Sequence, residues 1–134
     1  MTEKIPTASV SIETGKNFLI KAREFLETME SSLANRKWNA AALNAIHAGI
    51  SACDAVTTVL GGVRSKSQKH EDAVKVLKQI STAPGTVEAA GHLHQLLRLK
   101  HNVEYEGRLF VQADALTLAK HARRFVEWAV PLVG

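Results

Sequence analysis

The residues of this sequence that are best suited to chemistry gather in the stretch LHQLLRLKHNVEYEGR, residues 93–108. An α-helix advances by about 100° per residue, so four of these side chains would lie within a wedge of about 60°: His94, Arg98, His101 and Tyr105. Two imidazoles, a guanidinium and a phenol in one row could bind phosphate or assist RNA cleavage without a metal. The alternative is a solvated helix face, since polar side chains of a surface helix point to water.

The opposite side of this stretch is apolar, which predicts that one helix over residues 86–105 carries the row. Its apolar residues recur three or four positions apart, as on the buried face of an amphipathic helix: Ala89, Leu93, Leu96, Leu99 and Val103. Gly107 follows closely and is expected to end the helix, because glycine readily takes the left-handed conformation.

Four further segments show the helical period, and none alternates over a useful length with the period of two that strands require. The predicted fold class is therefore all-α, a single antiparallel bundle of about five helices. The further helices are expected over residues 11–33, 38–60, from a cap at Ser65 or Ser67 to 81, and 112–130. The helix over 38–60 is rich in alanine and should be the central, most buried one, because small side chains let neighbouring helices approach closely.

The ends of the elements follow from glycine, proline and polar residues. Gly61-Gly62 should end the second helix and Pro131 the last. Residues 1–10 are polar and include a proline, which predicts a flexible tail before a helical domain over residues 11–134.

Composition limits the class of protein. The formal net charge is +4, which suits an anionic partner but does not by itself indicate nucleic-acid binding. The first residues lack the apolar stretch of a secretory signal, and the longest apolar runs are shorter than the ~20 residues that cross a bilayer. The single cysteine, Cys53, lies in an apolar run and is expected to be a buried structural thiol. We therefore expect a cytoplasmic protein without a membrane partner.

The sequence lacks the patterns of most cofactor and metal sites. It contains no glycine-rich phosphate loop, no dinucleotide fingerprint, no HExxH and no Gly-x-Ser-x-Gly elbow, so neither a cofactor nor a metal is predicted. His47 and Asp54 lie two turns apart on one helix face, and we expect other groups of the fold to satisfy them. A basic cluster precedes the third helix and is either a solvated loop or a phosphate contact: Arg64, Lys66, Lys69 and His70.

Four segments, taken in order, resemble the HEPN family (higher eukaryotes and prokaryotes nucleotide-binding) over roughly residues 18–130. They are AALNAIHAGISACDAV, VLGGVRSKSQKHEDAVKVL, LLRLKHNVEYEG and ADALTLAKHARRFVEWA. The resemblance implies a helical bundle that forms a homodimer around the helix carrying the family motif. It also implies metal-independent ribonuclease activity in active members. Other members partner nucleotidyltransferases, including in toxin–antitoxin type systems, or bind nucleotides or RNA without cleaving.

The sequence departs from the family's catalytic motif, which is an arginine, four to six residues and then a histidine. In the best register Lys100 takes the place of the arginine and Tyr105 that of the histidine. Lysine holds phosphate only as a point charge, and a tyrosine with a pKa near 10 is a poor base at neutral pH. We therefore expect a non-catalytic HEPN-like homodimer that binds RNA, a nucleotide or a partner such as a nucleotidyltransferase. The candidate phosphate-binding residues are Arg98, Lys100, His101, Asn102, Tyr105, Lys66, Lys69 and His70.

Two other functions remain open. In an atypical metal-independent ribonuclease, His94 or His101 would act as the base and Arg98 or Lys100 would hold the phosphate. In a helical protein-interaction module without a nucleic-acid role, the same row would be a solvated face; the mild charge and the few aromatic residues are consistent with this third function.

Overall fold

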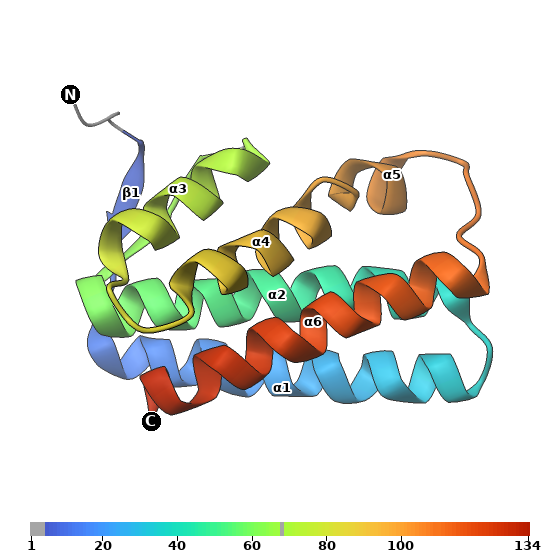
Figure 1. Cartoon of the computed structure of the whole chain (residues 1–134), viewed down its shortest axis with the longest axis horizontal. Coiled ribbons are helices and arrows are strands. Elements are labelled where there is room, and N and C mark those ends of the chain that lie inside the picture. The colour runs from blue at the N-terminus through green and yellow to red at the C-terminus, as the bar shows by residue number, and fades with distance from the viewer. Residues whose placement is uncertain (1–4, 68) are drawn as a thin grey trace.

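The computed structural model describes residues 5–67 and 69–134, apart from the side chain of His70. Within these residues the chain forms an all-α bundle with one small pair of strands, which confirms the predicted fold class (Figure 1). In chain order the elements are β1 Thr7–Ser9, α1 Ile12–Ala34, α2 Trp38–Gly61, β2 Val63–Ser65, α3 His70–Ile80, α4 Thr86–Leu97, α5 Lys100–Tyr105 and α6 Gln112–Val133.

The long helices α1, α2 and α6 run along the molecule, and the shorter α3, α4 and α5 follow one another along one side (Figure 1). Helix α2 packs on all five other helices and has more buried residues than any of them, as its small side chains predict. Helix α1 approaches it so closely that a Cβ on Gly15 would lie 2.5 Å from Cγ2 of Val59. The central helix expected from the sequence is confirmed.

The core lies between these helices. The apolar stripe of α6 is buried as predicted: Ala115, Leu118, Ala119, Ala122, Phe125, Val126 and Ala129. Cys53 is also buried, and burial raises the pKa of its thiol well above the ordinary value, with the neighbouring Asp54 charge adding to this. Among the described residues α2 is the one helix long and apolar enough to cross a membrane, but 61% of its apolar window is buried inside the bundle. Such burial is typical of the core helix of a globular bundle.

The segment expected to be a tail, residues 1–10, includes a short strand that the sequence did not predict. Strand β1 pairs antiparallel with β2, with Ala8 opposite Arg64. The N–H of Val10 donates to the carbonyl of Gly62 at 2.8 Å and that of Lys66 to Pro6 at 2.9 Å, which extends the pairing at both ends. Strands of three residues are too short to show alternation in a sequence, and residues 1–4 lie outside the described residues.

Two helix ends also differ from expectation. Gly62 adopts a left-handed φ of 66° after α2, as predicted, but α6 continues past Pro131 to Val133. A proline in the last turn removes only one backbone hydrogen bond, and the continued turn buries Val133. Gly107 lies beyond α5 but is not among the described glycines with positive φ, so it does not end that helix as expected.

Candidate phosphate-binding site

The helix predicted over residues 86–105 is broken near its carboxyl end. Helix α4 ends at Leu97 and α5 begins at Lys100, with Arg98 and Leu99 in a turn between them. The N–H of Leu99 bonds three residues back, to Leu96 at 3.4 Å, so the chain tightens there. Helix α5 contains weak helix formers such as His, Asn, Val and Tyr and has no buried residue, so little in its own sequence enforces a continuous helix.

The break divides the predicted row of polar side chains. His94 is exposed in the last turn of α4, and Arg98 donates from Nε to Oε1 of Gln95 at 2.9 Å. His101 and Tyr105 remain neighbours on α5, with ring centroids 5.4 Å apart, and both are exposed to solvent. The four residues expected to share one wedge are therefore distributed over two helices and a turn.

A carboxylate, Glu104, organises α5 against α2. Its Oε2 accepts a hydrogen bond from Nζ of Lys100 at 2.8 Å, and its Oε1 lies 3.2 Å from Nε2 of His47. Burial acts to raise the pKa of Glu104, but the hydrogen bond and charge of Lys100 and the charge of His47 outweigh it, so the pKa lies below its ordinary value. Asn102 is held locally, since its Nδ2 donates to Glu106 at 3.0 Å.

Asp54 is the only acidic residue of α2, and it faces the strand pair. Its Oδ2 lies 3.6 Å from Nη2 of Arg64 on β2, whose guanidinium also lies over the ring of Phe18. Burial raises the pKa of Asp54 to about 6, against the lowering effect of the Arg64 charge. The prediction that groups of the fold satisfy His47 and Asp54 is confirmed, with Glu104 and Arg64 as the partners.

A short loop between β2 and α3 presents the rest of the basic cluster. Ser67 Oγ donates to Oδ2 of Asp72 at 2.6 Å and accepts from the N–H of Lys69 at 3.1 Å. These bonds explain why α3 begins at His70, later than the serine caps predicted from sequence. Lys66 and Lys69 are exposed, and the side chain of His70 lies outside the described residues.

A cavity of about 200 Å³ joins these groups. Its polar lining is Asp54, Arg64, Ser65, Ser67, Lys69 and Lys100, and its apolar lining is Ile50, Ala73 and Leu97. Lys69 and Lys100, two predicted candidates from distant segments, thus line one space, whereas His94, Arg98, His101, Asn102, Tyr105 and Lys66 do not line it. Three cations and one carboxylate around a small cavity can hold an anion such as phosphate by charge-assisted hydrogen bonds.

Sequence reasoning named Arg64 in the basic cluster as a possible phosphate contact, but it did not place Asp54 beside it. The signals available were the single carboxylate of an otherwise small and apolar helix, and an arginine in the basic cluster. Neither reveals that the β1–β2 pair turns Arg64 toward α2. In the described ranges no three His, Cys, Asp or Glu side chains are placed to hold a metal ion.

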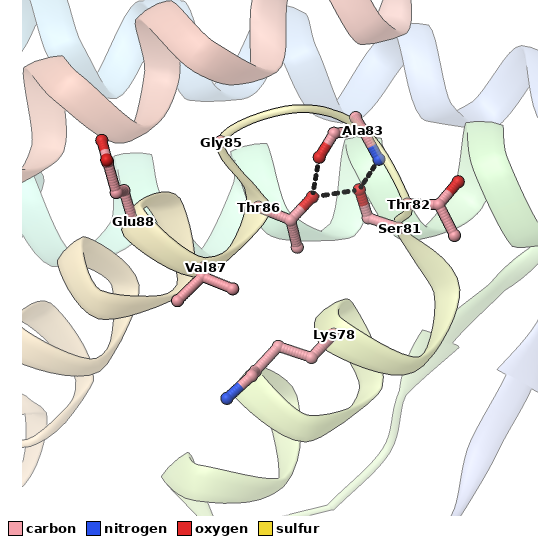
Figure 2. Close-up of a pocket in the computed structure, with 8 residues that line it drawn as sticks. All are labelled: Lys78, Ser81, Thr82, Ala83, Gly85, Thr86, Val87 and Glu88. Carbon is pink, nitrogen blue, oxygen red and sulfur yellow. Dashed lines mark hydrogen bonds between the residues drawn. The ribbon is translucent and has the colours of Figure 1, made fainter.

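A larger hollow of about 460 Å³ lies at the corner between α3 and α4 (Figure 2). Two of its hydroxyl groups bond each other and the turn: Ser81 Oγ lies 2.8 Å from Thr86 Oγ1, which donates to the carbonyl of Ala83 at 2.7 Å. Its lining has one cation, Lys78, and one carboxylate, Glu88. The hollow therefore has no excess of positive charge, and the hydroxyls of Ser81 and Thr86 stabilise the connection between the helices.

Two histidines meet where α4 packs on α6. The Nδ1 atoms of His92 and His121 lie 2.9 Å apart, so one ring donates to the other. Burial lowers the pKa of His121, as do the charges of His92, Lys120 and Arg98. The sequence spacing did not indicate this pair, and neither histidine lines the 200 Å³ cavity.

Comparison with known proteins gave one finding on the family. The model of a family described as the HEPN domain matches residues 16–132, which is most of the chain. The chain matches none of the curated proteins with which it was compared.

Proposed function

Because the chain belongs to the HEPN domain family, we propose that it is a non-catalytic, cytoplasmic HEPN protein that binds RNA or a nucleotide through phosphate. The observation that carries this proposal is the cavity in which Lys69, Arg64 and Lys100 face a single carboxylate. Lys100 holds the position of the family's arginine, so the binding site adjoins the motif helix α5.

The surroundings of α5 support binding without cleavage. Cleavage of RNA requires a base and a phosphate-holding group that converge on the reacting atoms. Lys100 is bonded to Glu104, and the exposed phenol of Tyr105 stands where the family has a histidine. His101 lies 3.8 Å from the carboxylate of Glu106 and contacts Tyr105, but it does not line the cavity that holds the cations.

Removing either lysine of the cavity should weaken binding. We expect Lys69→Ala and Lys100→Ala each to raise the Kd for a labelled single-stranded RNA or a nucleoside monophosphate by about tenfold, because each removes a charge-assisted contact. Wild-type affinity should also fall steeply as salt increases, since phosphate contacts release counterions. Fluorescence anisotropy at two salt concentrations measures both effects. The matched control is Lys78→Ala, an exposed lysine of α3 outside the cavity, which should leave the Kd unchanged.

Incubation of the same RNA in EDTA tests the absence of catalysis. Wild type should leave the RNA intact. Cleavage that disappears in His101→Ala would contradict the proposal and indicate a metal-independent ribonuclease. Failure to bind either RNA or nucleotides would also contradict it and would favour a protein-interaction module.

We also propose that the protein forms a homodimer through the end of the bundle that carries α5. The segment from Tyr105 to Leu116 runs from the last residue of α5 through the connection into the start of α6 at this end (Figure 1). It holds four of the exposed large apolar residues of the described chain: Tyr105, Leu109, Val111 and Leu116. Tyr105 and Leu109 are 72% and 76% exposed, and several exposed apolar side chains in one segment are typical of a protein interface.

Charge placed on this face should separate the protomers. We expect sedimentation of the wild type at micromolar concentration to give a dimer and that of Leu109→Asp/Leu116→Asp to give a folded monomer. Val87→Asp is the matched control, because Val87 is 74% exposed near the start of α4 and lies outside this segment. A monomeric wild type would contradict the dimer, and this face would then suit another protein, such as a nucleotidyltransferase.

A further inference from the structure

We infer that Asp54 gates the cavity: an anion binds there as the Asp54 carboxylate takes up a proton and releases Arg64. The inference rests on the proposed function and adds the regulation of the same site. In the free protein the Asp54 carboxylate lies 3.6 Å from Arg64 and is itself the anionic partner of this arginine. A phosphate that binds Arg64 must therefore displace this carboxylate or share the guanidinium with it.

The lining of the cavity places a bound anion beside the Asp54 carboxylate. The cavity of about 200 Å³ is lined by Asp54 together with Arg64, Lys69 and Lys100. A phosphate held by these three cations would therefore lie near Asp54, whose side chain is only 15% exposed. Two like charges at such close range in a poorly solvated place disfavour each other's ionised forms.

The other charged groups near Asp54 are paired or exposed to solvent. Lys100 on α5 is paired with Glu104, and Asp72 on α3 accepts the Ser67 hydroxyl. Lys69, before α3, is exposed to solvent. His47, on the same helix as Asp54, lies beside Glu104 and carries an ionisable imidazole, so an experiment must separate the two groups.

The sign of the pH dependence follows from Asp54. Burial raises the pKa of this carboxyl to about 6 in the free protein, and a bound anion that also occupies Arg64 raises it further. At a pH between the pKa of Asp54 in the free protein and its higher pKa in the complex, the complex holds up to one more proton than the free protein. Anion affinity should therefore fall as the pH rises above 6, by at most about tenfold per pH unit for one proton.

Sulfate tests this coupling, because it stays a dianion across the range and mimics the phosphate group. Isothermal titration of the full chain between pH 6 and 8 should give a sulfate affinity that falls by about tenfold or more. In Asp54→Asn the profile should become nearly flat, with tighter binding than wild type at pH 8. Glu24→Gln, which removes an exposed carboxylate of α1, and His47→Gln should both keep the wild-type slope.

The other possible results of this titration contradict either the gate alone or the binding site as well. Sulfate binding that does not depend on pH in the wild type would overturn the gate but leave the proposed binding site intact. A slope that persists in Asp54→Asn, or disappears in His47→Gln, would assign the proton to another group and also overturn it. Absence of sulfate binding in both wild type and Asp54→Asn at every pH would contradict the binding site itself, and the gate with it.

Discussion

Replacement of Glu104 with alanine is expected to release α5 from the bundle. Helix α5 has only six residues and none is buried, so its packing is weak, and the Glu104 carboxylate between Lys100 and His47 is its main polar link to α2. Its removal leaves two basic groups side by side without their shared partner. We expect a loss of about 1–3 kcal/mol in the free energy of unfolding. Hydrogen exchange of the α5 amides should accelerate by about tenfold or more, because they open locally.

The pH dependence gives a second check on Glu104. Its pKa is lowered in the folded protein, so the stabilisation is present above the ordinary carboxyl pKa and is lost as pH falls through the folded value. The difference between wild type and Glu104→Ala should therefore shrink in acid. Glu106→Ala is the control, since the bonded partners of Glu106 are the nearby His101 and Asn102. If both variants accelerated exchange equally, Glu104 would have no special role in holding α5.

Truncation of Phe125 should cause the largest loss of stability. Its side chain is completely buried in α6, within the core that also includes α1, α2 and α4, and its ring centroid lies 5.7 Å from that of Trp128. Phe125→Ala removes this buried area and leaves a cavity, which typically costs about 3–5 kcal/mol. Urea denaturation followed by circular dichroism should show a lower midpoint with an unchanged slope.

The control for Phe125 is Phe18→Ala, since Phe18 is only partly buried at the edge of the same core. Its loss should be clearly smaller, because less apolar area leaves water when it packs. Similar losses for the two variants would contradict the position of Phe125 at the centre of the bundle.

The sequence by itself determined the features that depend on local periodicity and residue type. The buried stripe of α6 and the central position of α2 follow from apolar and small residues at helical spacing, which the helix geometry places on one face. The departures at Lys100 and Tyr105 are likewise visible in the chain, because a missing arginine or histidine needs no structure to be recognised. Gly62 ended its helix as predicted, since a left-handed residue favours glycine.

Only the tertiary structure decided which of these residues meet. The break at Arg98 and Leu99 divides a row that a continuous helix would have aligned, and no propensity of the segment is strong enough to indicate it. The β1–β2 pair places Arg64 beside Asp54, and the path of α5 places Lys100 at the cavity that Lys69 also lines. These contacts join segments that are distant in the chain, so they depend on how the helices pack. Local sequence spacing does not encode that packing.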